Sequence, residues 1–222
     1  MTITVYSISG APRPWRVLLG LAFKGLEYEI ALLELSRGDL KSKAFLTLNP
    51  RGTVPVLVDG PVSIADSIGA LAWLDRAYPE RPLFGDTAED AARVWQATMD
   101  VAEYLRNACD RLLSPIFFKG VKNGTPALIA AAGEVRHELG RIEAALAERS
   151  FLVLDGPTAA DAAAFPEVRI LQRAVDTRPE IMAALGLDDL AGNFPSLDAW
   201  KRRVENLPAV EKTFPPHWTQ PA

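Results

Sequence analysis

The fold of this chain is best predicted from residues 49–57, which read Asn49-Pro50-Arg51-Gly52-Thr53-Val54-Pro55-Val56-Leu57. The first four residues are a turn signal, and the β-branched run after them predicts a short strand. Asp59-Gly60 is a two-residue hairpin signal, so Val62 to Ile64 is expected to return as the partner strand. Asp66-Ser67 is then expected to cap a helix. A hairpin followed by a capped helix is therefore predicted.

The residues before this hairpin add strands and helices in alternation. Thr2 to Ser7 alternates like a half-buried strand, and Tyr28 to Leu35 is an apolar run of strand length. Helices are predicted from Trp15 to Lys24 and, briefly, from Ala44 to Leu48. The order β-α-β-α-β-β-α therefore predicts a small α/β domain over residues 1–77.

The sequence changes character at a proline-rich linker, residues 78–86. Strand signals largely disappear after it, and helix starts recur. Capping boxes occur after Asp86 and at Thr158 to Asp161, and prolines begin further helical segments at Pro126 and Pro195. Residues 87–222 are therefore predicted to form an all-helical domain.

Composition excludes several classes of function. The net charge of −4 over 222 residues argues against a nucleic-acid partner. The single cysteine, Cys109, and two distant histidines, His137 and His217, permit neither a disulfide nor a Cys/His metal site, and we interpret the histidines as surface or cap residues. No apolar run reaches the ~18 residues of a membrane span, and the N-terminus lacks a signal-peptide pattern. A cytoplasmic protein without a metal or a membrane partner is expected.

Three stretches together resemble the cytosolic glutathione transferase superfamily. They are residues 49–57, Asp66-Ser67 at a helix start, and Thr158-Ala159-Ala160-Asp161. The resemblance covers nearly the whole chain, because residues 194–210 are similar to the family's final helices. Each stretch alone is weak, whereas their order and spacing together are specific for the fold.

The resemblance implies a thioredoxin-like α/β N-terminal domain followed by an all-α C-terminal domain. Residues 1–77 would bind glutathione, residues 78–86 would link the domains, and residues 87–222 would form the helical domain. It also implies a cytoplasmic homodimer that uses glutathione as co-substrate, without a metal, in detoxification. Trp15-Arg16-Val17 and Asn49 to Gly52 are somewhat similar to the zeta class.

The resemblance also assigns residues to the binding of glutathione. The Val54-Pro55 bond would be cis, which would leave the Val54 N–H and C=O to pair with an extended peptide. The Ser67 hydroxyl and the helix N–H groups would take the γ-glutamyl carboxylate, and Asp66, where relatives usually have Glu, would pair with the amine. Thr53 stands where relatives often have a ligand-contacting Gln. Lys41 lies in the segment that contacts the glycyl carboxylate.

Each of these residues also has a purely structural interpretation. Pro55 can be an ordinary strand-entry proline, and Asp66 a plain N-cap. Lys41 can be a solvated surface charge. Without the family pattern, the structural interpretation would be preferred for the proline.

The catalytic position of the serine and cysteine classes lies five residues before the arginine that corresponds to Arg16, and Ala11 occupies it. Thiol–disulfide exchange is therefore excluded, since its nucleophile is a thiolate. Pro12 and Pro14 have no N–H. Because the residue before a proline is biased to an extended conformation, Arg13 is predicted as the helix cap and Pro14 as the first helical residue.

Two nearby groups are candidates for replacing the missing catalytic side chain. We hypothesise that Ser9, Arg13 or a backbone N–H such as that of Ala11 holds the glutathione thiolate. The alternatives are a turn serine and a surface arginine. Tyr104 and Ala108 are candidates for the electrophile pocket, although apolar residues at helical spacing are also typical of a core or a dimer contact.

Two functions follow from these features. The first is a glutathione transferase that adds the thiolate to a small hydrophobic electrophile or isomerises it. The alternative is a non-catalytic glutathione-binding or scaffold protein that keeps the fold. The alanine at position 11 favours the second, whereas the retained Val54-Pro55 and Asp66-Ser67 favour the first.

Overall fold

The computed structural model describes residues 2–121 and 124–218 and contains two compact units. One unit takes in the residues up to Asp86 together with those from Glu205 onward, and the other runs from Thr87 to Val204. The final residues therefore group with the first unit, although the sequence analysis assigned them to the helical domain. The predicted boundaries at 77, 86 and 87 stay a prediction.

The first unit is built on a four-stranded mixed sheet. Its strands are β1 (Ile3–Ser7), β2 (Tyr28–Leu32), β3 (Val56–Asp59) and β4 (Val62–Ile64), in the order β2-β1-β3-β4. β1 and β2 are parallel, whereas β1–β3 and β3–β4 are antiparallel. The predicted hairpin across Asp59-Gly60 is confirmed, and the second strand ends at Leu32 instead of Leu35.

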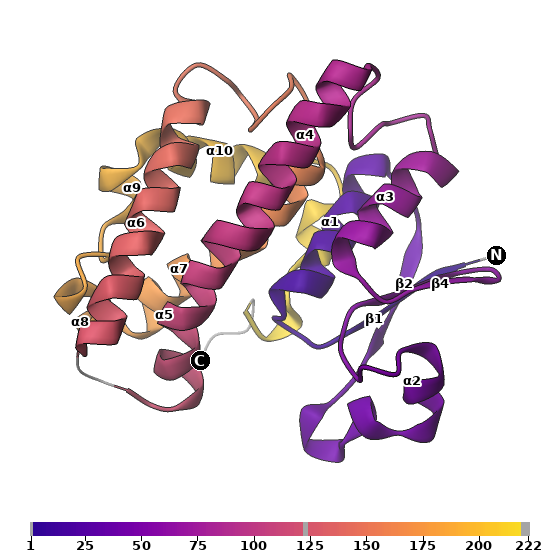
Figure 1. Ribbon diagram of the computed structural model, residues 1–222, viewed down its shortest axis with the longest axis horizontal. Helices are drawn as coiled ribbons and strands as arrows, with labels where there is room; N and C mark the ends of the chain where they lie inside the picture. The colour runs from indigo at the N-terminus through magenta and orange to yellow at the C-terminus, as the bar shows by residue number, and fades with distance from the viewer. Residues whose placement is uncertain (1, 122–123, 219–222) are drawn as a thin grey trace. The chain divides into compact units, whose positions relative to one another are not determined.

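Three helices accompany this sheet: α1 (Pro12–Lys24), α2 (Lys43–Leu48) and α3 (Ser67–Ala77). Figure 1 shows α1 and α3 side by side. They bury an apolar layer that includes Val17, Leu19, Leu71 and Leu74. Two short 3₁₀ turns, η1 (Leu35–Arg37) and η2 (Asp39–Lys41), lead from β2 to α2.

The predicted start of α1 is wrong. The helix begins at Pro12, and Ala11 is its N-cap with φ −76° and ψ 125°. Both Ala11 and Arg13 precede a proline, and the extended conformation falls on Ala11. Pro12 and Pro14 both fit the first turn because the N–H groups there need no helical acceptor.

The end of the chain packs with α1 in the first unit. It contains η4 (Val210–Thr213) and η5 (Pro216–Trp218). The Trp15 indole N–H donates to the Thr213 hydroxyl at 2.8 Å in a buried position. This hydrogen bond joins residues 198 positions apart and ties the chain end to the first helix.

The second unit is helical, as predicted. Its elements are α4 (Ala88–Asp100), η3 (Val101–Leu105), α5 (Arg106–Phe118), α6 (Pro126–Leu146), α7 (Ala159–Thr177), α8 (Pro179–Ala184), α9 (Leu190–Asn193) and α10 (Pro195–Glu205), of which the last residue belongs to the first unit. The η3 segment is a π-helical stretch between α4 and α5 that the sequence did not predict. The predicted capping box at Thr158 and Asp161 is confirmed at the start of α7.

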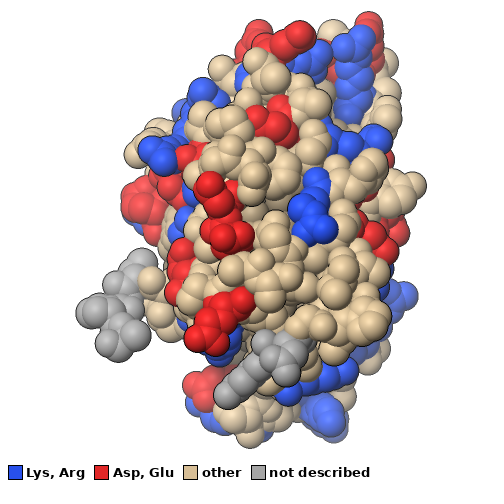
Figure 2. Space-filling model, turned by 90° about the vertical axis from the view of Figure 1, so that its left-hand side faces the viewer, with Lys and Arg blue, Asp and Glu red and all other residues tan. Residues whose placement is uncertain are grey.

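Figure 2 shows Lys and Arg side chains interspersed with Asp and Glu on one face of the molecule, in keeping with the net charge of −4. Among the described residues, no helix is both long and apolar enough to cross a membrane.

Candidate functional site

The strand register brings the three predicted binding stretches to one edge of the sheet. Tyr6, near the end of β1, is opposite Val56 at the start of β3, and Leu57 is opposite Ile64 at the end of β4. The segments that follow β1, precede β3 and follow β4 therefore leave the sheet at the same edge. These segments contain Ser9 to Arg13, Thr53 to Pro55, and Asp66-Ser67.

The turn before β3 is held by the buried Asn49 side chain. Its amide donates to the Thr53 carbonyl at 2.6 Å and to the Thr53 hydroxyl at 3.1 Å, and its oxygen accepts from the Arg51 N–H at 3.1 Å. The Val54-Pro55 bond is cis, as the resemblance implied. Within residues 2–121 and 124–218, the N–H and C=O of Val54 have no hydrogen-bond partner.

A glycine brings the Lys41 segment against this turn. Gly52 has φ +61°, and a Cβ built on it would lie 2.9 Å from the Leu40 carbonyl oxygen. A side chain at position 52 would therefore push the Leu40–Lys41 backbone away. Lys41 is exposed, and it makes no ion pair with the part of the chain that the structure describes.

The start of α3 leaves some polar groups unused. Asp66 Oδ1 accepts from the N–H groups of Ile68 at 2.9 Å and Gly69 at 2.8 Å. These two N–H groups, which the sequence analysis offered to a ligand, are therefore already bonded. Among the described residues, Asp66 Oδ2 and the N–H and hydroxyl of the largely buried Ser67 have no partner.

The loop between β1 and α1 offers few backbone donors. The Ala11 N–H donates to the Ile8 carbonyl at 3.0 Å. The prediction that this N–H is open to a ligand is therefore wrong. Pro12 and Pro14 have no N–H. The Arg13 N–H has no acceptor among the described residues, and the Arg13 side chain is exposed.

His217 lies beside this loop, and its contact with Ser9 was not predicted from the sequence. The Ser9 hydroxyl and His217 Nδ1 are 2.9 Å apart. From the sequence alone, His217 is interpreted as a surface or cap residue. The contact with Ser9 joins positions 208 apart. Long-range packing sets this contact, and no local signal marks it.

The side chains of the four tyrosines make their contacts with other parts of the chain. The Tyr6 ring packs against Phe45, with 5.9 Å between ring centroids. Burial raises the pKa of Tyr28, at the opposite end of the sheet, to about 12. The Tyr78 hydroxyl donates to Asp59 at 2.8 Å, and Tyr104 lies in the second unit.

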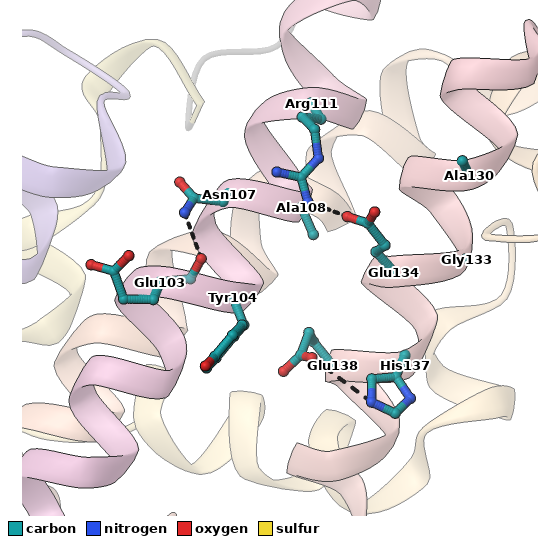
Figure 3. A pocket seen from close by; sticks show the side chains of 10 residues that line it. All are labelled: Glu103, Tyr104, Asn107, Ala108, Arg111, Ala130, Gly133, Glu134, His137 and Glu138. Carbon is teal, nitrogen blue, oxygen red and sulfur yellow. Dashed lines mark hydrogen bonds and ion pairs between the residues drawn. The ribbon is translucent and has the colours of Figure 1, made fainter.

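Tyr104 and Ala108 meet at a pocket of about 660 Å³ within the second unit. Figure 3 shows it between the η3–α5 segment and α6, with an Arg111–Glu134 ion pair at its rim. The lining also includes Glu103, Asn107, Ala130, Gly133, His137 and Glu138. Four of these lining residues are charged, namely Glu103, Arg111, Glu134 and Glu138, so the pocket is not purely hydrophobic, and the electrophile site stays a prediction.

No cluster of three or more His, Cys, Asp or Glu residues suited to a metal ion occurs in residues 2–121 and 124–218.

Comparison with known proteins gives a match in both units. Residues 11–77 match the family model "Glutathione S-transferase, N-terminal domain", and residues 108–208 match "Glutathione S-transferase, C-terminal domain". Glutathione S-transferase 2 of Schizosaccharomyces pombe is 28% identical over 232 aligned positions, covering 95% of this chain and 94% of that protein. Glutathione S-transferase 1 of Dianthus caryophyllus is 40% identical over 93 residues, which is 42% of each chain.

A solved structure of Ure2p in complex with glutathione has a similar fold. It is 25% identical, with a TM-score of 0.82, and the match covers 96% of this chain and 98% of that chain.

Proposed function

We propose that this chain, which belongs to the cytosolic glutathione transferase superfamily, binds glutathione at the sheet edge described above and transfers its thiolate to a small electrophile. One observation carries the proposal. The backbone of Val54 and the polar groups of Ser67, which have no partner in the part of the chain that the structure describes, come to the same edge of one sheet. An extended peptide with a terminal carboxylate complements such a pair of sites.

Each part of glutathione has a complementary group in this proposal. The cysteinyl backbone pairs with the Val54 N–H and C=O beside Pro55. The γ-glutamyl carboxylate accepts from the Ser67 hydroxyl and N–H, and its ammonium pairs with Asp66 Oδ2. Lys41 faces the glycyl carboxylate. The Thr53 hydroxyl accepts from Asn49, so its own proton is left to donate.

The sulfur would lie at the loop between β1 and α1. Ser9 supplies a hydroxyl, and Arg13 supplies a positive charge and an open N–H. Ala11 contributes packing only, because its N–H is bonded to Ile8. Catalysis then consists of lowering the thiol pKa from ~8.5 and placing the sulfur against the electrophile.

The rest of the proposal follows the family. The electrophile is a small hydrophobic molecule that is conjugated or isomerised in detoxification, with Tyr104 and Ala108 as proposed contacts. The protein acts in the cytoplasm as a homodimer, with glutathione as co-substrate.

A second function is a non-catalytic glutathione carrier. The bonded Ala11 N–H and the two prolines leave the first turn of α1 poor in donors for a thiolate. In that case the Val54 backbone and the Ser67 hydroxyl and N–H would bind glutathione without lowering the pKa of its thiol.

Calorimetry with glutathione, followed by a conjugation assay with an aryl halide, tests both functions. We expect binding, turnover, and about a tenfold loss of affinity in Ser67→Ala, equivalent to about 1.4 kcal/mol. Ser63→Ala is the matched control, because Ser63 is exposed on β4 and pairs in the ladder through its backbone. Binding without turnover would favour the carrier. No binding at millimolar glutathione would overturn both.

A further inference from the structure

The Ser9–His217 contact joins two segments from opposite ends of the chain. Ser9 lies in the loop after β1, and His217 lies in η5. Both belong to the first unit, in which η4, shortly before η5, packs with α1. The Ser9 hydroxyl oxygen and His217 Nδ1 are 2.9 Å apart, and the imidazole is exposed to solvent. The pair is therefore accessible from solvent in the loop that leaves the sheet after β1.

The position of His217 is determined by contacts with the buried Trp15 on both sides of it. Before it, the Thr213 hydroxyl accepts from the Trp15 indole at 2.8 Å and donates to the Val210 carbonyl at 2.7 Å. After it, the Trp218 ring packs edge-on against Trp15, with 5.2 Å between centroids. The segment that carries the imidazole is thus anchored to α1.

The loop is also shaped to admit the ring. Gly10 has φ +80°, and a Cβ built there would lie 3.2 Å from His217 Cε1. This spacing is tighter than nine in ten real Cβ contacts. A side chain at position 10 would therefore strain the backbone and require the imidazole to shift by a few tenths of an ångström.

We propose that Ser9 and His217 act as a hydroxyl–imidazole pair that accepts the proton of the glutathione thiol and holds the thiolate. Ser9 contacts the sulfur, and His217 is a positioning residue that acts through Ser9. This inference rests on the proposed binding of glutathione.

The proton transfer balances without any further reactant. The thiol proton passes to the Ser9 oxygen while the Ser9 hydroxyl proton passes to His217 Nδ1. The sulfur then carries the negative charge and the imidazole the positive charge, and no electrons are exchanged. In the product state His217 Nδ1–H donates to Ser9, so the serine hydroxyl donates to the thiolate. A neutral imidazole that accepted from Ser9 would leave the hydroxyl without a proton for the sulfur.

The surroundings explain why such a pair is needed. Ala11 occupies the family's catalytic position, its N–H is bonded to Ile8, and the flanking prolines have no N–H. The Ser9 hydroxyl thus supplements the Arg13 N–H, which has no acceptor among the described residues.

The test measures the ultraviolet absorbance of bound thiolate against pH and, separately, the affinity for S-methylglutathione, which has no thiol. The variants are Ser9→Ala, Ser9→Thr and His217→Phe, with Ser63→Ala as the control at an exposed position of β4. We expect Ser9→Ala and His217→Phe to raise the thiol pKa by about one unit, a tenfold loss of thiolate near neutrality. Ser9→Thr should retain the wild-type thiol pKa, and Ser63→Ala should not change it.

The two ligands separate the failure of this inference from the failure of the proposed function. In all four variants we expect S-methylglutathione affinity to stay within twofold of wild type. An unchanged thiol pKa in His217→Phe, with normal S-methylglutathione binding, would overturn the pair alone. If the wild type binds neither ligand, the proposed function is overturned and the pair with it.

Discussion

Two aspartates at helix starts, Asp66 in the first unit and Asp161 in the second, differ in how many of their hydrogen-bonding sites are occupied. Asp161 is fully buried, and each of its oxygens accepts two hydrogen bonds. Oδ1 accepts from the Leu152 N–H and the Trp200 indole, and Oδ2 accepts from the N–H and hydroxyl of Thr158. Burial raises its pKa, and these four donors oppose that shift.

Asp66 is exposed, and only one of its two carboxylate oxygens accepts hydrogen bonds from the described residues. Oδ1 caps α3 through Ile68 and Gly69, and Oδ2 has no partner among the described residues. Aspartate near a helix start, as the N3 residue of α7 in one case and the N-cap of α3 in the other, is therefore a structural anchor in one unit and a partly open acceptor in the other. The oxygens of Asp161 are saturated by donors of the protein, whereas Asp66 Oδ2 is open to solvent.

The largest expected effect is that of Asp161→Asn. In either orientation, the asparagine NH₂ group would face hydrogen-bond donors, either the Leu152 N–H and the Trp200 indole or the N–H and hydroxyl of Thr158. We therefore expect a loss of about 2–4 kcal/mol in the free energy of unfolding. Urea denaturation measures it. Asp155→Asn makes the same change in the exposed loop before α7 and should stay within about 0.5 kcal/mol. Equal effects in the two variants would contradict the anchoring role.

Asp66→Asn should show the opposite pattern. Asparagine caps a helix as well as aspartate does, so we expect the free energy of unfolding to change by less than about 0.5 kcal/mol. Glutathione affinity should fall about tenfold because the charge opposite the ammonium is lost. Calorimetry checks this, with the exposed Asp86→Asn as control. Unchanged affinity would show that the ammonium binds elsewhere.

A third helix-start aspartate, Asp198 in α10, should show the smallest effect. Its hydrogen bond from Lys201 at 2.7 Å lowers its pKa. The charged form therefore stabilises the fold above the unfolded pKa, and this contribution is lost as pH falls through the lowered pKa. We expect Asp198→Asn to cost less than about 1 kcal/mol at neutral pH. Urea denaturation at neutral and acidic pH, against Asp188→Asn, should show the difference vanish in acid. A pH-independent difference would contradict it.

Much of the fold was predictable because its signals are local. The Asp59-Gly60 turn, the Asp66 cap and the Thr158–Asp161 box each lie within a few residues of what they organise, and all three are present. The start of α1 was not predictable. Ala11 and Arg13 both precede a proline, and the preference of such residues for an extended conformation does not choose between them. The π-helical stretch at 101–105 had no local signal either.

The candidate site was predictable only where the family pattern carries it. Thr53, Val54 and Asp66-Ser67, which the resemblance assigns to glutathione binding, leave the sheet at a common edge, and their role in binding stays a prediction. The occupied Ala11 N–H depends on the turn geometry from Ile8, and the His217 contact depends on the folding of the chain end. Neither is encoded by neighbouring residues.

The hydrogen bond between Trp15 and Thr213 has a consequence for biosynthesis. Trp15 leaves the ribosome well before the hydroxyl that its indole donates to, because Thr213 lies 198 positions later in the chain. Contacts between such distant positions form late, after the intervening chain is available. The helical unit, whose residues are contiguous and lie between the two, can fold during translation. The first unit is therefore completed only after the helical unit has been translated.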